Sequence, residues 1–204
     1  MIEIIIVLAV IAVLGVILMP RLAINKATPG QINCINNLKQ VSLGLLLWSD
    51  DNDDHLPSQI LLRSNGVMEL VEAGYIAPAF TVISNKLDTP KVLLCPEDRE
   101  RKAATSFSKE FCESNISYFL GLDANKFAPQ MFLAGDDNIK VLGKLAGRGR
   151  LDVTTNILVN WSDQRHMNRG NIALGDGSVQ SFTTTALRTA IRNAGTNVIR
   201  LAFP

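Results

Sequence analysis

The sequence predicts an α+β protein, with a long N-terminal transmembrane helix packed in its second half on a small, mainly antiparallel β-sheet. Three observations predict this class. Residues 1–19 are apolar except for Glu3, apolar side chains recur at helical spacing over residues 34–48, and short apolar segments bounded by Pro, Gly and Asp follow residue 90. We therefore divide the 204-residue chain into a transmembrane helix, residues 1–27, and one globular domain, residues 28–204.

The apolar segment is long enough to span a bilayer. From Ile4 to Met19 a helix extends about 24 Å, and Met1 and Ile2 bring it close to the ~30 Å hydrocarbon core. A cleaved signal peptide would need a basic start and a small-residue cleavage site, and neither is present. Arg21 and later cations would by themselves keep the domain in the cytoplasm. We instead expect basic residues upstream of Met1, which would place the domain in the periplasm.

A second helical stretch is expected to begin after Thr28. Thr28 is a suitable N-cap, Pro29 occupies the first helical position, and Gln31 completes a capping box. Apolar residues then recur at steps of four and three, which predicts one buried face made of Cys34, Leu38, Val41, Leu45 and Trp48. The opposite face is also largely uncharged, so we expect both the domain's sheet and neighbouring subunits to cover this helix.

An acidic loop follows this helix and could bind Ca²⁺ through Asp50, Asp51, Asp53 and Asp54. An EF-hand loop is excluded, because it would need Gly in place of His55 and Glu in place of Leu61. A solvated loop is the favoured interpretation, and a calcium site is the alternative.

The remaining elements are short. We expect helices over Met68–Ala73, ended by Gly74, and from a Thr185 cap to Ala194, ended by Gly195. The expected strands are Lys91–Cys95, Asn115–Leu120, Gln130–Leu133, Asn156–Trp161, Asn171–Gly175 and Ser178–Phe182. Asp176-Gly177 is expected to form a two-residue turn between the last two strands, with both residues at positive φ.

The three cysteines leave the redox state open. In an oxidising compartment Cys95 and Cys112 could form a disulfide that contributes roughly 3 kcal/mol. Cys34 would then remain a buried thiol. No cysteine spacing matches a zinc or redox motif.

His166 precedes Asp176-Gly177 by nine residues and suggests an active site. A hydrolase would also need a nucleophile or three metal ligands, and the only other histidine, His55, belongs to the acidic loop. We therefore expect no enzyme and no catalytic residues. In this interpretation His166 bonds to backbone or to an acidic neighbour and holds the hairpin in place, with a ligand or metal role as the alternative.

Four separated motifs resemble one family. They are Ile2-Glu3 with the apolar run and Pro20, Cys34-Ile-Asn-Asn-Leu-Lys-Gln, Cys95-Pro-Glu-Asp, and His166 with Asp176-Gly177. Together they resemble the type IV pilin and type II secretion pseudopilin superfamily, in particular prepilin-like proteins with a C-terminal H-X9-DG domain. The family's basic leader, its Gly and its Phe are missing here.

The resemblance implies a structural subunit, held in the inner membrane with a periplasmic domain, that polymerises through its N-terminal helix into a pilus or pseudopilus. Glu3 would pair with the N-terminal amine of an adjacent subunit, and Pro20 would let the helix bend. The implied partners are other pilin-like subunits, the assembly machinery and, if a leader precedes Met1, a prepilin peptidase. A net charge of +1 argues against nucleic-acid binding.

Two other functions stay open from the sequence. A monomeric, membrane-tethered periplasmic binding module would not polymerise and would be indifferent to Glu3. A tethered hydrolase would need a pocket of convergent titratable groups, for which only His166, Asp163 and Asp176 are candidates.

Overall fold

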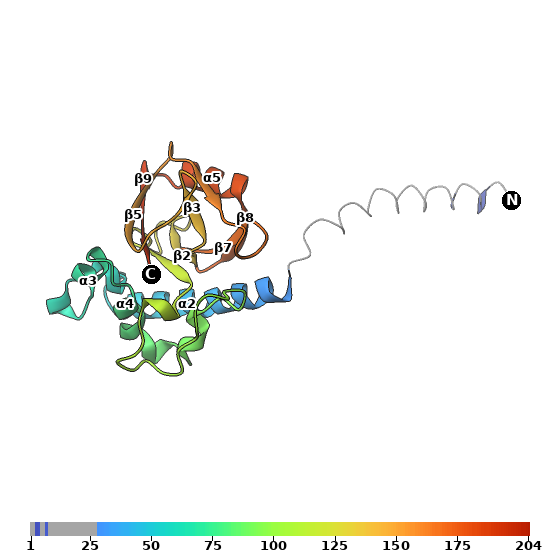
Figure 1. Cartoon of the computed structure of the whole chain (residues 1–204). Coiled ribbons are helices and arrows are strands. Elements are labelled where there is room, and N and C mark those ends of the chain that lie inside the picture. Colours follow the sequence, from blue (N-terminus) through green and yellow to red (C-terminus); the bar gives the residue numbers. More distant parts are fainter. Residues whose placement is uncertain (1–2, 5–6, 8–27) are drawn as a thin grey trace.

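The computed structural model describes Glu3, Ile4, Val7 and residues 28–204 (Figure 1). Four α-helices follow residue 28, namely α2 (Pro29–Asp50), α3 (Met68–Glu72), α4 (Ala77–Val82) and α5 (Thr184–Asn193). The 3₁₀ helices are η1 (Pro57–Gln59), η2 (Leu62–Ser64), η3 (Ser84–Lys86), η4 (Pro90–Leu93) and η5 (Glu113–Asn115). The strands are β1 (Tyr118–Gly121), β2 (Phe132–Asp136), β3 (Ile139–Val141), β4 (Lys144–Leu145), β5 (Gly149–Thr154), β6 (Val159–Trp161), β7 (Arg169–Leu174), β8 (Val179–Thr183) and β9 (Val198–Phe203).

The described part of the chain is a β-rich domain with two sheets. Six strands form the larger sheet in the order β5-β9-β1-β2-β7-β8, and the smaller sheet has the order β4-β3-β6. Every pairing between neighbouring strands is antiparallel. Because the last strand, β9, lies between β5 and β1, the larger sheet is complete only when the C-terminal strand has paired with both.

The predicted fold class and location need correction. Among the described residues, no helix combines the length and the apolar composition needed to cross a bilayer. The prediction of a long transmembrane helix packed on the sheet is therefore wrong, and so is the predicted single-pass location in the inner membrane. Apart from Glu3, Ile4 and Val7, the predicted assembly helix of residues 1–27, with Pro20, lies outside the described residues.

The start of α2 is confirmed. The Thr28 side chain accepts a hydrogen bond from the backbone N–H of Gln31 at 3.1 Å, and Pro29 occupies the first helical position. The Gln31 side chain donates to Ser181 Oγ at 3.0 Å, so it connects α2 to β8. This Gln31 contact therefore holds the first turn of α2 against the sheet.

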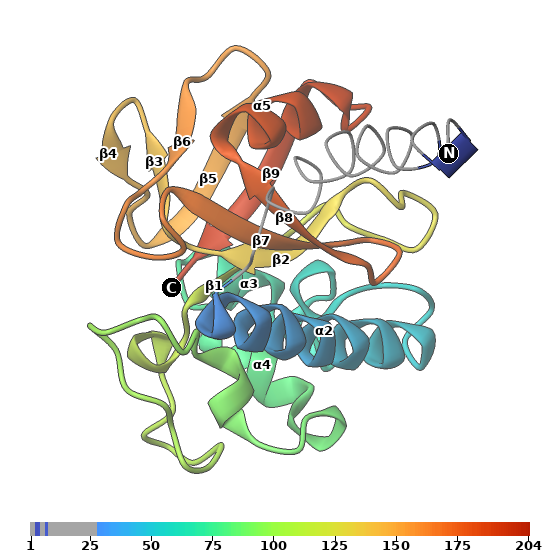
Figure 2. The same cartoon turned by 90° about the vertical axis from the view of Figure 1, so that its right-hand side faces the viewer.

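Helix α2 lies between two layers. On one side it contacts β7, β2 and β8, and on the other it contacts η3 and η4 (Figure 2). Its buried face contains all five residues predicted for it, which are Cys34, Leu38, Val41, Leu45 and Trp48. They form the first hydrophobic core together with Phe80, Ile83, Leu93 and the near face of β1 and β2.

A second hydrophobic core covers the other face of the large sheet. Phe119, Phe132 and Phe203 face α5 and the small sheet, which contribute Leu187 and Trp161. Because both faces are covered, every residue of β1 and β2 is buried, whereas the edge strand β8 is largely exposed.

Several predicted elements shift or change type. Residues 91–95 were expected as a strand, but Thr89 caps the 3₁₀ helix η4 at Pro90, and a proline at that position favours a helical start. The last helix begins earlier than expected, because the Thr183 side chain accepts a hydrogen bond from Ala186 N at 3.2 Å. The prediction omitted β3, β4, β5 and β9.

The β7–β8 hairpin has a longer turn than predicted. Gly177 N donates to Leu174 O at 2.9 Å, and Leu174 N donates to Ser178 O at 2.9 Å. Three residues, 175–177, therefore connect the strands, and only Gly177 of Asp176-Gly177 has positive φ, at 81°. The two-residue turn was wrong; this is the three-residue hairpin loop that ends on a left-handed residue.

We expect Gly177→Val to destabilise the domain by roughly 1–3 kcal/mol, within the cost of a strained backbone position. A β-carbon at this φ would also lie 3.1 Å from Leu46 Cδ1 of α2. Ser178→Val is the matched control, since Ser178 is an ordinary residue just before β8. Urea unfolding of both variants would measure the difference, and equal midpoints would contradict the assigned turn.

Candidate functional site

Four side chains meet in the interior of the domain between α2 and the large sheet. They are Cys34, Cys95, Asp136 and His166, and all four are buried. One potential ligand atom from each side chain lies within 4.8 Å of those of the other three. These atoms are two sulfurs, one carboxylate oxygen and one ring nitrogen, which is a donor set typical of transition-metal sites.

Close contacts connect the four groups. The Cys34 thiol lies 3.1 Å from Asp136 Oδ1, and Cys95 Sγ lies 3.2 Å from His166 Nε2. His166 Nε2 is also 3.5 Å from Asp136 Oδ2. The side chains of Asp136 and His166 are completely excluded from solvent, with 0% exposure.

Each of the four comes from a different element. Cys34 lies on the inner face of α2, and Asp136 is the last residue of β2. Cys95 follows η4, in a segment held against α2 by a 3.0 Å hydrogen bond from Asn37 Nδ2 to Leu94 O. His166 belongs to the loop between β6 and β7.

The backbone around His166 is unusual. His166, Met167 and Asn168 all have positive φ, at 52°, 52° and 62°. Non-glycine residues in this region cost of order 1–3 kcal/mol each and cluster at ligand-binding sites. The result is that the His166 ring points inward while Met167 is 77% exposed.

Residues around the four-residue cluster contact its members, and Glu97 is the one beside His166. His166 Nδ1 lies 3.0 Å from Glu97 Oε2, although the approach is not aligned as a hydrogen bond. The same Glu97 oxygen accepts the backbone N–H of His166 at 3.0 Å, and Oε1 accepts the Thr28 hydroxyl at 2.5 Å. Glu97 therefore links His166 to the N-cap of α2.

Asp136 and Cys34 also have outer partners. Asp136 Oδ2 accepts hydrogen bonds from Asn171 N at 2.7 Å and from Asn171 Nδ2 at 2.9 Å. Tyr118 Oη lies 3.3 Å from Cys34 Sγ. With Oδ2 occupied by Asn171, Asp136 Oδ1 is the oxygen that faces the thiol.

The two thiols differ in acidity. A hydrogen bond with Cys34 lowers the pKa of Cys95 to about 6, and His166 acts in the same direction. Burial raises the pKa of Cys34 well above its ordinary value. Burial opposes a charged His166, yet its contacts with Cys95 and Asp136 raise its pKa overall. The interior of the cluster is thus polarised, with Cys95 the more readily ionised thiol.

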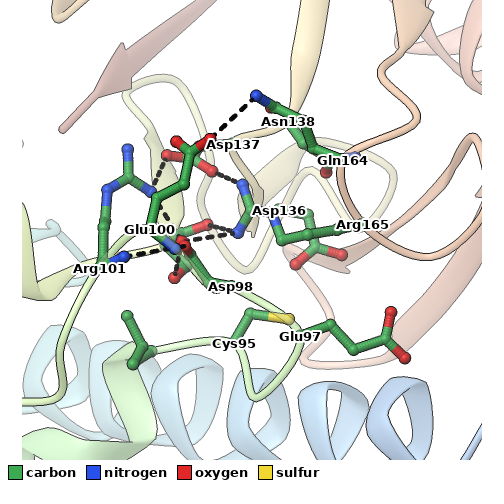
Figure 3. A network of polar contacts seen from close by, with 12 residues as sticks. Cys95, Glu97, Asp98, Glu100, Arg101, Asp136, Asp137, Asn138, Gln164 and Arg165 are labelled. Atoms are coloured by element: carbon green, nitrogen blue, oxygen red, sulfur yellow. Dashed lines mark hydrogen bonds and ion pairs between the residues drawn. The ribbon is translucent and has the colours of Figure 1, made fainter.

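An ion-pair network lies beside the cluster (Figure 3). Arg165 contacts Asp137 and lies 3.4 Å from Asp98, and Arg101 lies 2.6 Å from Asp137. Burial raises the pKa of Asp137, even though both arginines favour its charged form. This network holds the 98–101 segment against the residues that flank Asp136 and His166.

The other predicted site residues lie elsewhere. Asp176 is in the hairpin turn, where its Oδ1 accepts a hydrogen bond from Ser178 N at 2.9 Å. Interactions with the Ser178 side chain, and then with its backbone, lower the pKa of Asp176. Asp51 pairs with Lys86 at 2.7 Å. Asp50 and Asp54 share Lys126, so this cation already partly balances the charge of the proposed calcium loop. Glu3 is exposed.

The possible disulfide between Cys95 and Cys112 is not formed in this structure. All three cysteines are free, Cys112 is exposed, and Cys95 is buried against Cys34 and His166. Sequence reasoning placed Cys34 on a buried helix face and left open whether Cys95 forms a disulfide, and it missed Asp136. The motifs beginning at Cys34 and Cys95 and the isolated His166 were the available signals, but nothing in the sequence showed that they meet.

The fold and the site define a β-rich domain that contains a closed cluster of thiol, imidazole and carboxylate groups. No protein-family model, curated protein or solved structure matches the chain. The cluster's groups are buried, and close contacts connect them.

Proposed function

We propose that this protein is a non-catalytic, pilin-like structural subunit that assembles with other pilin-like subunits, copies of itself included, through its N-terminal region. The observation that carries the proposal is a set of exposed large apolar side chains on the outer face of α2, which we call the α2 stripe. Leu43 and Leu47 are one turn apart, whereas the exposed Asn36, Lys39 and Gln40 separate them from Ile32. Ile32, Leu43 and Leu47 are exposed by 49%, 57% and 42%. Large apolar side chains aligned on one helix face are typical of interaction surfaces.

Two features support a second subunit as the occupant of this stripe. Between Pro29 and Ser49, α2 carries one charged residue, Lys39, which is exposed between Ile32 and Leu43, so burial of the outer face would desolvate a single charge. The apolar sequence of residues 4–19 precedes α2 in the chain, so it could extend the same contact surface. Glu3 would provide a charge that fixes the register of the subunits.

The absence of catalysis is part of the proposal. A hydrolase would present its reactive groups to a substrate, but His166 and Asp136 have fully buried side chains. The near-neutral net charge of +1 supports protein partners over nucleic acids.

Chemical crosslinking of the purified full chain tests the proposal. We expect the wild type to form oligomers and the Leu43→Glu/Leu47→Glu double variant to lose most of them, because assembly would bury two unpaired carboxylates. Glu3→Gln should weaken assembly as well.

The control is Leu158→Glu, a substitution of the same type at a residue that is 49% exposed and lies between β5 and β6. It should assemble like the wild type. A wild-type chain that stays monomeric at all concentrations would reject the proposal and favour a monomeric binding module. Equal assembly of the α2 and Leu158 variants would reject the α2 stripe as the contact.

A further inference from the structure

We propose that Cys34, Cys95, Asp136 and His166 bind one Zn²⁺ ion in a structural site. The proposal is independent of assembly, since all four ligands belong to one chain. A metal at this position would cross-link α2, the segment after η4, the end of β2 and the β6–β7 loop.

The ligand types select the metal. Zn²⁺ is bound by cysteine sulfur, histidine nitrogen and carboxylate oxygen, and structural zinc sites have four protein ligands and no open position. Ca²⁺ and Mg²⁺ prefer oxygen ligands throughout, so two thiolates argue against them. Two cysteines, one histidine and one aspartate therefore favour zinc.

The distances fit a tetrahedral ion. Zinc–ligand bonds of about 2.0–2.3 Å give ligand–ligand separations of about 3.3–3.8 Å. The Cys34 sulfur lies 3.1 Å from Asp136 Oδ1, the proposed ligand oxygen, and the Cys95 sulfur lies 3.2 Å from His166 Nε2. The 3.5 Å contact of His166 Nε2 is with the other Asp136 oxygen, Oδ2. The widest separation is within 4.8 Å, so side-chain movements of about an ångström would complete the tetrahedron.

The residues that contact His166 and Asp136 from outside the cluster are of the kinds usually found around zinc ligands. A metal-binding histidine usually presents its second nitrogen to a carboxylate or carbonyl, and ligating carboxylates are themselves hydrogen-bonded. Here His166 Nε2 points to the cluster while Nδ1 faces Glu97 at 3.0 Å. Asn171 occupies Asp136 Oδ2 with two hydrogen bonds and leaves Oδ1 for a metal.

The charges also favour a cation. A buried carboxylate and two thiols are costly to ionise in the same small volume unless a cation balances them. Two thiolates, one carboxylate and Zn²⁺ sum to a charge of −1, and the nearby Arg165 interacts favourably with Asp136. A disulfide between Cys34 and Cys95 is the competing arrangement, because it would remove both thiolates.

Metal analysis of the full chain tests this proposal. After purification with a reductant and dialysis against zinc, we expect one zinc per chain. Cys34→Ser and His166→Gln should bring this value close to zero. Replacing zinc by Co²⁺ should give the absorption of a tetrahedral thiolate complex in the wild type.

Two matched controls separate ligands from other residues of the same type. Cys112→Ser and His55→Gln replace an exposed cysteine and the second histidine, and both should keep one zinc. Glu97→Gln should still bind zinc, but about 10–100-fold more weakly, because Glu97 contacts the ligand His166 and is not a ligand itself.

A wild-type measurement guards against variants that do not fold. A strong chelator should lower the melting temperature of the wild type, and added zinc should restore it. No zinc in the folded wild type, zinc retained by the folded Cys34→Ser variant, or a Cys34–Cys95 disulfide persisting under these conditions would each overturn the proposal.

Discussion

Replacing Arg165 by Met should destabilise the protein by about 3 kcal/mol or more, the range for breaking a buried ion pair by removing one partner. Arg165 is 7% exposed and contacts Asp137 and Asp98, whose side chains are each 6% exposed. Arg101 would remain beside both carboxylates but is itself 27% exposed. The variant would therefore leave two buried carboxylates with one partly solvated cation.

The loss should depend on pH. Burial raises the pKa of Asp137 in the folded protein, and removal of Arg165 would raise it further. A carboxyl group whose folded pKa is above its unfolded pKa destabilises the fold at high pH, and this penalty is relieved as the pH falls through the folded pKa. The variant should therefore recover part of its stability in mild acid.

Denaturant unfolding of wild type and Arg165→Met at several pH values would measure both effects. Arg150→Met is the matched control, since Arg150 pairs with Glu72 and Asp152 on the surface, where an ion pair contributes about 0–1 kcal/mol. If the two variants lose equal stability, the buried network does not have the role assigned to it.

Gly121→Ala should lower stability by more than about 3 kcal/mol or prevent folding, beyond the usual cost of overpacking. An added β-carbon would lie 1.7 Å from the carbonyl oxygen of Phe132. The obstacle is backbone of the neighbouring strand β2, next to an irregularity in its pairing with β7 between Phe132 and Ala134. No side-chain rotation can relieve this contact.

Gly147→Ala is the control for this variant, because a β-carbon there would have no atom within 4 Å. It should be neutral or slightly stabilising, since alanine restricts the unfolded chain. Comparison of soluble yield and melting temperature would separate the two glycines. A folded Gly121→Ala protein of wild-type stability would contradict the close approach of β1 and β2.

Local patterns predicted the elements that local interactions specify. The Thr28 cap and the apolar face of α2 depend on residues within one or two helical turns, and both are observed. The β7–β8 pairing was also expected, although its turn was given one residue too few. In contrast, β9 was missed, and its place between β1 (Tyr118–Gly121) and β5 (Gly149–Thr154) is defined by partners distant in sequence.

The sequence by itself predicted that Cys34 would be buried on a helix, whereas for His166 it left a structural contact and a ligand role both open. It did not determine which residues His166 contacts, because the four cluster residues belong to segments that meet only after α2 packs on the sheet. Only the tertiary structure decided that Cys95 faces His166 rather than Cys112, and that Asp136 completes the group. The physical reason is that residue type and local spacing specify helix caps and buried faces, whereas contacts between distant segments depend on how whole elements pack.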